Sequence, residues 1–220
     1  MTVIVTEIEV ADPPAAWTRA GFDVEADDVC SIGSVGVRLT GRDGGTGIRG
    51  WSMSGLPAPD WAGALDGIPT ARSVAREINR GVHPNGSCEI DHVVLFSPDL
   101  DRTVAAFTGI GVHPRRERDA ELGGRPVRQI FFRLGEVVVE VVGSPTTADD
   151  GPSTLWGITY VVADIDATAA FFGDRTSPVK DAVQTGRRIC TLRHRDLDIT
   201  VPTAFISARR RAGDGARCLS

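Results

Sequence analysis

This sequence has no long apolar run, no closely paired cysteines and only one lysine. No stretch approaches the roughly 18–20 consecutive apolar residues that span a bilayer, so we expect no membrane partner. The N-terminal stretch "MTVIVTEIEV" is acidic where a secretory signal would be basic, which predicts a cytoplasmic protein. Lys180 is the only lysine among 24 basic residues, and this bias is typical of the high-GC genes of actinobacteria.

The charge balance and the cysteines exclude further classes of protein. A net charge of −5 argues against nucleic acid as the main partner, because phosphate contacts need a basic face. No CxxC pair occurs among the four cysteines, so a thiolate zinc site is not expected, and free thiols are favoured in a cytoplasmic chain. Phosphate loops, GxSxG and HExxH are also absent, which removes support for the hydrolases that use them.

Three segments of the chain begin alike, at Val3, Ile90 and Trp156. Each reads as an apolar strand, a turn with aspartate and a short helix that ends in an aromatic residue, as in "IDHVVLFSPDLDRTVAAF". The turn residues Asp99 and Asp164 are expected to accept hydrogen bonds from the free N–H groups at the helix starts. The closing aromatic residues are expected to pack on a sheet, and they are Trp17, Phe107 and Phe171 or Phe172.

The segments also continue alike, with strand-like runs such as "RQIFFRL" and "EVVVEVV" after the second helix. Gly135 lies between these two runs, and a glycine at this place indicates a compact hairpin. A strand, a helix and then two or three strands recur with a period of roughly 50 residues, which indicates an internal repeat. We therefore predict an α+β fold in which repeated βαβββ modules form curled mixed sheets around a cleft, the usual place for a ligand.

The repeats divide the chain into five predicted segments. These are a degenerate module at 1–56, a connector at 57–88 with a short helix in "ARSVAREINRG", a module at 89–146, a second module at 153–206 and a flexible tail at 207–220.

The stretches "IDHVVLFSPDLDRTVAAFTGIGV" and "RQIFFRLGEVVVEVVG" resemble the opening and closing strands of a vicinal oxygen chelate module. This superfamily includes glyoxalase I, extradiol dioxygenases and bleomycin resistance proteins, and the likeness covers about residues 89–206. The chain also resembles glyoxalase-like proteins of actinobacteria. The resemblance implies a cleft for a small molecule and a metal-dependent lyase or isomerase that uses Ni, Zn, Mn, Fe or Co. The alternative that it implies is a metal-free binding protein of the resistance or sequestration type.

His92 and Glu140 are the candidate metal ligands. In the metal-dependent members each module supplies a His or Gln from its first strand and a Glu from its fourth, and these two residues match those positions. Glu140 is the only charge within a run of valines, and a lone buried carboxylate is costly unless a metal or partner meets it. A ligand that detaches can act as a base, so Glu140 is also the candidate catalytic proton acceptor.

The third unit departs from this pattern. Gly157 falls at the position of the histidine, and Thr200 or Asp198 falls near that of the glutamate. Three ways of completing the site remain open. Other residues could add ligands, a symmetric homodimer could bring two copies of His92 and Glu140 together, or the cleft could bind its ligand without a metal.

Several other residues are weaker candidates. Additional ligands could come from Gln129, His113, Glu7 or Glu9, although surface positions are favoured for these. A metal-free cleft could be lined by Trp156, Phe131, Phe132 and Trp51, although aromatic residues in strands belong more often to the core. The stretch "HPRRERD" could steer an anionic ligand, although its mixed charge favours an exposed strand. His83 and His194 lie in turn-like segments and are expected to be solvated.

Overall fold

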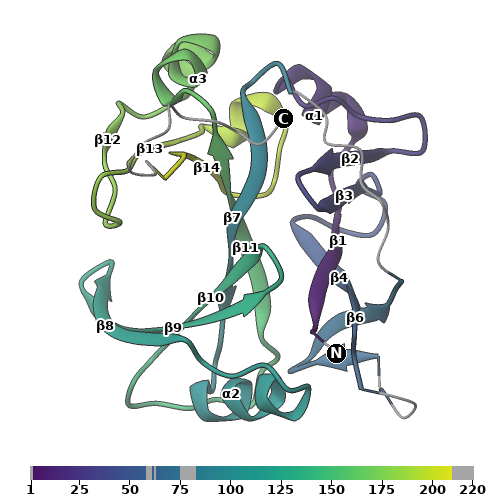
Figure 1. Ribbon diagram of the computed structural model, residues 1–220, viewed down its shortest axis with the longest axis vertical. Helices are drawn as coiled ribbons and strands as arrows, with labels where there is room; N and C mark the ends of the chain where they lie inside the picture. The colour runs from purple at the N-terminus through teal and green to yellow at the C-terminus, as the bar shows by residue number, and fades with distance from the viewer. Residues whose placement is uncertain (1, 58–60, 62, 75–82, 210–220) are drawn as a thin grey trace.

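The computed structural model describes residues 2–57, 61, 63–74 and 83–209. In these residues two mixed β-sheets pack on each other, and three short α-helices lie at their ends (Figure 1). Most of the predicted helix in "ARSVAREINRG" and most of the predicted tail fall outside the described residues. Within the described part of the chain no helix is long and apolar enough to cross a membrane.

The first sheet has six strands in the order β2-β3-β1-β4-β6-β5. Its elements are β1 (Ile4–Val10), α1 (Pro14–Arg19), β2 (Val29–Ile32), β3 (Val35–Leu39), β4 (Ile48–Ser54), β5 (Ala64–Leu65) and β6 (Ile68–Arg72). β1 pairs in parallel with β3, and its antiparallel neighbour β4 pairs in parallel with β6. The sheet thus consists of two short halves. β4 begins the second half rather than ending a first module, and the predicted connector at 57–88 contributes β5 and β6.

The second sheet has eight strands in the order β12-β13-β14-β11-β7-β10-β9-β8. Its first unit comprises β7 (Ser87–Phe96), α2 (Leu100–Gly109), β8 (Arg116–Leu122), β9 (Arg125–Leu134) and β10 (Val137–Gly143). Its second unit comprises β11 (Thr154–Val162), α3 (Ile165–Phe172), η1 (Gly173–Arg175), β12 (Lys180–Asp181), β13 (Arg188–Thr191), η2 (His194–Leu197) and β14 (Thr203–Ser207).

The two units of the second sheet repeat one plan. In each, the first strand pairs in parallel with the last, and the two first strands, β7 and β11, lie antiparallel at the centre. Asp99 caps α2 by accepting from Arg102 N at 3.0 Å, and Asp164 caps α3 by accepting from Asp166 N at 2.9 Å. Gly135 turns the β9–β10 hairpin with a φ of 71°. The capping and hairpin predictions are confirmed, and the architecture is the predicted α+β arrangement of curled mixed sheets.

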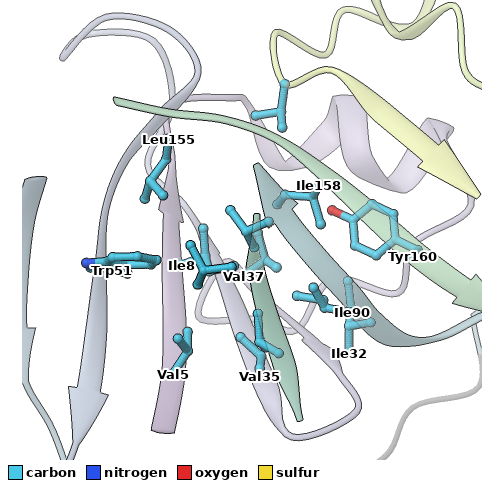
Figure 2. Close-up of a cluster of buried hydrophobic side chains, with 14 of the residues drawn as sticks. Val5, Ile8, Ile32, Val35, Val37, Trp51, Ile90, Leu155, Ile158 and Tyr160 are labelled. Atoms are coloured by element: carbon cyan, nitrogen blue, oxygen red, sulfur yellow. The ribbon is translucent and has the colours of Figure 1, made fainter. Parts of the chain in front are cut away.

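Apolar side chains fill the space between the two sheets (Figure 2). The cluster in Figure 2 includes Val5, Ile8, Val37, Trp51, Ile90, Leu155, Ile158 and Tyr160. Trp17, Phe107 and Phe172 are buried as predicted, whereas Phe171 is 49% exposed. One face of the second sheet therefore packs in the core, and its opposite face is available for a site.

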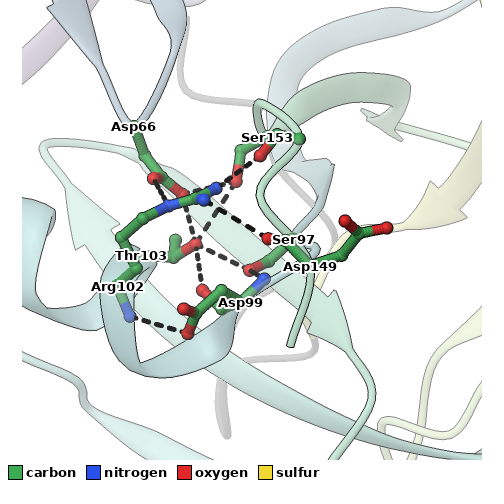
Figure 3. A network of polar contacts seen from close by, with 8 residues as sticks. Asp66, Ser97, Asp99, Arg102, Thr103, Asp149 and Ser153 are labelled. Atoms are coloured by element: carbon green, nitrogen blue, oxygen red, sulfur yellow. Dashed lines mark hydrogen bonds and ion pairs between the residues drawn. The ribbon is translucent and has the colours of Figure 1, made fainter. Parts of the chain in front are cut away.

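A polar network joins the first sheet to the start of α2 (Figure 3). The Asp66 side chain, between β5 and β6, is only 2% exposed and forms an ion pair of 2.6 Å with Arg102 Nε. It also accepts hydrogen bonds from the hydroxyl groups of Thr103 and Ser153. The buried carboxylate is thus surrounded by donors, as a buried charge requires.

The cysteines follow the expectation only in part. Cys30 and Cys190 are buried free thiols, and burial raises the pKa of Cys190 to about 11. Cys88, in contrast, is disulfide-bonded, which corrects the expectation of free thiols throughout.

The prediction that His83 is solvated is wrong, because its side chain is buried at 3% exposure. Its Nδ1 accepts from Asp23 N at 3.1 Å, and its Nε2 lies 3.0 Å from Ser31 O. Nδ1 therefore carries no proton, and Nε2 donates to the carbonyl. Burial lowers the pKa of His83, and the hydrogen bond to Ser31 offsets this only in part.

His83 is expected to make folding stability depend on pH. The unfolded chain takes up a proton at this residue near pH 6.5, about the ordinary pKa of histidine, and the folded protein only at lower pH. The free energy of unfolding should therefore be highest above about pH 6.5 and fall as the pH drops, by at most about 1.4 kcal/mol per pH unit. Urea unfolding of the His83→Gln variant at pH values on either side of 6.5 should show a flatter dependence. The exposed His113→Gln variant should keep the wild-type slope, and equal slopes in the two variants would contradict this prediction.

Candidate functional site

The second sheet curls so that its two end strands, β8 and β12, approach each other on one side of the molecule (Figure 1). The inner side of the curl holds a pocket of about 360 Å³. It is lined by Asp91, His92, Arg116, Arg118, Phe131, Val138, Glu140, Ala182, Val183, Gln184, Ile189, Ile206 and Arg209. Both units of the sheet contribute to this lining, as the predicted cleft requires.

An irregularity in β7 turns two consecutive side chains toward the pocket. His92 pairs with Thr159 of β11, and Ile90 pairs with the next residue, Tyr160, so Asp91 is left as an extra residue in β7. In a regular strand consecutive side chains point to opposite faces. A bulge relaxes this rule and is a common way to re-aim a side chain beside a site. Asp91 and His92 therefore both line the pocket.

His92 and Glu140 lie together on the floor of the pocket. β7 and β10 run in parallel with His92 opposite Val138, so Glu140 is two residues further along and faces the same side. His92 Nε2 is 3.6 Å from Glu140 Oε2, and the two side chains are 15% and 14% exposed. The structure thus brings together the two residues that the sequence singled out.

The other carboxylate oxygen of Glu140 is held from β9. Gln129 Nε2 donates to Glu140 Oε1, and Gln129 Oε1 accepts from Arg118 Nε at 2.5 Å. These contacts fix both ends of the Gln129 amide. Gln129 therefore orients Glu140, and its own oxygen is engaged by Arg118.

His92 is held from the opposite side by Asp91. The Asp91 Oδ2 atom lies 2.8 Å from His92 Nδ1, and its Oδ1 atom lies 2.5 Å from Arg187 Nη1. Burial raises the pKa of the Asp91 carboxyl, but the hydrogen bond with His92 and the charge of Arg187 outweigh it and hold this pKa well below its usual range. An ionised Asp91 accepts the proton of Nδ1, so Nε2 is the nitrogen turned toward the pocket.

Sequence reasoning missed Asp91 and Arg187. Strand alternation would have placed Asp91 away from His92. Arg187 follows β12 in a different unit, 96 residues further along the chain, so its contact with Asp91 cannot be read from the sequence. The Arg187 side chain is 4% exposed and also donates to Ser207 O at 2.6 Å. The adjacency of an aspartate and a histidine in "EIDHVV" was the one available signal.

The third unit offers no matching ligands. The helix caps Asp99 and Asp164 are equivalent, so His92 corresponds to Gly157, as predicted. Glu140 is paired with Val94, whose counterpart Thr159 is paired with Ala204, so Ala204 takes the place of the glutamate. A side chain at Gly157 would meet the carbonyl oxygen of Pro202, at 2.7 Å from its Cβ.

The expectation that Thr200 or Asp198 occupies the glutamate position is therefore wrong, because β14 begins only at Thr203. The Thr200 hydroxyl donates to Asp12 at 2.7 Å, which joins the second unit to the first sheet. Asp198 lies outside the strand and pairs with Arg42 at 2.6 Å.

Most of the weaker candidates lie away from the pocket. His113 is exposed and precedes β8, and Glu7 pairs with Arg38 on the first sheet. Phe131 does line the pocket, whereas Phe132 and Trp51 belong to the core. The remaining two are Glu9, which is exposed, and Trp156, which packs against Phe96.

The donors around the pocket do not fit a four-ligand metal site. His92 and Glu140 supply two ligand atoms, and the equivalent Gly157 and Ala204 supply none. Both Asp91 oxygens are engaged by His92 and Arg187. In the part of the chain that the structure describes, no group of three or more His, Cys, Asp or Glu side chains could hold a metal ion.

The sequence of residues 91–191 matches the family model described as Glyoxalase/Bleomycin resistance protein/Dioxygenase superfamily. This part of the chain is therefore similar to the superfamily that the sequence resemblance indicated. The match starts at Asp91 and covers most of the eight-stranded sheet, which we call the glyoxalase-like sheet from here on. No curated protein matches the chain significantly.

Solved structures extend the likeness to the whole chain. A triple mutant of 4-hydroxymandelate synthase from Streptomyces coelicolor superposes with a TM-score of 0.66 at 13% identity, covering 98% of this chain and 95% of that one. A xylose isomerase-like TIM barrel/4-hydroxyphenylpyruvate dioxygenase fusion protein gives 0.55 at 14% identity, covering 98% of this chain and 50% of that one. At such identities the likeness shows the fold alone, here for both sheets.

Proposed function

We propose that this protein binds a small organic molecule in the pocket of the glyoxalase-like sheet, with His92 and Glu140 as the groups that meet it. The observation that carries this proposal is the pair of facing atoms, His92 Nε2 and Glu140 Oε2, held 3.6 Å apart. Each side chain is anchored at its far end, His92 by Asp91 and Glu140 by Gln129. The two atoms are therefore left to share a proton or to receive a polar group of the ligand.

Proton transfer is the chemistry that this pair favours. A histidine nitrogen and a carboxylate oxygen in one pocket can take a proton from a ligand atom and return it at another. Glu140 is the proposed proton acceptor, and His92 is the proposed partner on the other side. An isomerase or lyase that moves a proton next to a carbonyl group would use such a pair.

A second candidate is a metal site shared between two chains. The family resemblance implies a divalent ion such as Ni, Zn, Mn, Fe or Co, and His92 with Glu140 presents half of the usual ligands to an open pocket. A homodimer that joined two pockets would supply the other half. Metal analysis separates this candidate from the metal-free one, and the homodimer and the cytoplasmic location stay predictions.

Metal content and ligand binding test the proposed function together. We expect elemental analysis and native mass spectrometry of the purified protein to find no stoichiometric transition metal, even after incubation with each ion. Stabilisation by bound fragments should be unaffected by a chelator. Their affinity should fall about ten-fold or more in His92→Ala and in Glu140→Ala, since each removes a polar partner of the ligand.

Matched controls are the exposed residues His113 and Glu117, whose alanine variants should bind as the wild type does. One ion per chain, lost in both site variants, would overturn the metal-free proposal. One ion per two chains, lost in the same variants, would establish the shared site instead.

A further inference from the structure

Two arginines on one wall of the pocket form no ion pair with any carboxylate that the structure describes. Arg116 and Arg118 are two residues apart on β8 and both line the pocket. The Arg118 guanidinium lies 5.6 Å from the centre of the Phe131 ring and donates through Nε to Gln129. Among the ion pairs of the described residues, none involves Arg116 or Arg118.

The acidic groups on the floor do not cancel this positive charge. Asp91 is already paired with Arg187, which leaves the single carboxylate of Glu140 against the two guanidinium groups of Arg116 and Arg118. The charge left to face the pocket from the β8 wall is therefore positive. Guanidinium groups bind carboxylates and phosphates through charge-assisted hydrogen bonds.

Strand register places these arginines at a useful distance from the floor. Arg116 is opposite Phe131, and Phe131 is opposite Glu140. With neighbouring strands about 4.8 Å apart, the backbones of Arg116 and Glu140 are separated by roughly 10 Å. A small molecule can therefore reach from the arginines to the His92–Glu140 pair.

The opposite wall comes from the second unit of the sheet and the residues after it. It presents the apolar side chains of Val183, Ile189 and Ile206 beside the polar Gln184 and Arg209. Val183 lies in the turn after β12 and is 79% exposed, so its side chain is accessible to a ligand in the pocket. This wall suits a hydrocarbon or aromatic body.

We propose that the ligand is a small organic anion with an apolar body. Its anionic group binds Arg116 and Arg118, its body packs against Val183, Ile189 and Ile206, and the atoms between them lie over His92 and Glu140. This inference rests on the proposed function, because it names the class of ligand for the same pocket.

Matched probes of different charge test the inference on the full-length protein. Phenylacetate and hexanoate are compared with their neutral amides and with phenethylamine and hexylamine, by titration calorimetry or ligand-observed NMR. We expect the carboxylates to bind about ten-fold or more tightly than the amides, and the amines to bind more weakly still. The Arg116→Gln/Arg118→Gln variant should lose this preference, so that each carboxylate binds about as weakly as its neutral amide.

Arg115→Gln is the matched control, because Arg115 is an exposed neighbour that does not line the pocket. It should keep the preference for carboxylates. If amides or amines bind as tightly as carboxylates and lose binding in His92→Ala, the pocket stands and the anionic class is overturned. If no probe binds in a way that depends on His92, the proposed function itself fails.

Discussion

Replacement of Arg187 by methionine is expected to lower the free energy of unfolding by about 3–5 kcal/mol, because it leaves the buried carboxylate of Asp91 without its guanidinium partner. The Arg187 side chain is 4% exposed and that of Asp91 is 12% exposed. The guanidinium also donates to Ser207 O at the end of β14, so it joins β7 to the other unit of the sheet. Urea unfolding at neutral pH measures the loss.

The Arg187→Met effect should depend on pH in a defined direction. In the wild type the pKa of Asp91 is lowered, so its contribution is present above the unfolded pKa of about 3.9 and is lost as the pH falls through the folded pKa. Without Arg187 the pKa of Asp91 should rise from its lowered value, because burial raises it and only the contacts with His92 then oppose that effect. The stability difference between variant and wild type should therefore shrink below about pH 4, where protonation removes the charge.

Two further variants show whether the ion pair is the cause. The Asp91→Leu/Arg187→Met variant should recover most of the lost stability, because neither charge is then buried alone. Arg188→Met is the control, since Arg188 is 45% exposed and its surface pair with Asp166 should be worth less than about 1 kcal/mol. Equal losses in Arg187→Met and Arg188→Met, or no recovery in the double variant, would contradict the assignment.

The second large effect is expected at Asp66. The Asp66→Ala variant should lose about 3 kcal/mol, because it removes the acceptor of Arg102, Thr103 and Ser153 at a site that is nearly closed to water (Figure 3). For a chain of this size that corresponds to a fall in Tm of roughly 6–12 °C. Thermal unfolding followed by circular dichroism measures it.

The network around Asp66 offers its own graded controls. Asp66→Asn keeps one acceptor oxygen without the charge, so it should lie between the wild type and the alanine variant. Asp101→Ala removes an exposed carboxylate from the first turn of α2 and should cost less than about 1 kcal/mol. A loss in Asp101→Ala as large as that in Asp66→Ala would show that the helix terminus, rather than the buried network, is responsible.

Much of the glyoxalase-like sheet could be predicted because its signals are local. The caps Asp99 and Asp164, the hairpin at Gly135 and the alternation of apolar strands each depend on a few neighbouring residues. The first sheet was harder to predict, because β4 looks the same in sequence whether it ends one unit or begins another. Only its pairing with β1 and β6 distinguishes these alternatives.

The candidate site divides in the same way. Glu140 could be found because a lone charge among valines requires a partner. His92 could be found because the family resemblance places a metal ligand at its position in the first strand of the module. Their proximity follows from the parallel pairing of β7 and β10. The absence of donors at Gly157 could be read from the sequence, but the identity of its companion, Ala204, required the register of β14.

The sequence by itself determined the repeated units, their helix starts and turns, and the two residues at the centre of the candidate site. Only the tertiary structure decided that Asp91 joins His92, that Arg187 pairs with Asp91 and that Arg116 and Arg118 face the same pocket. The physical reason is that a bulge and an ion pair between units depend on how strands far apart in the chain align. Local sequence fixes the direction of a side chain within its strand, whereas the packed sheet fixes what that side chain meets.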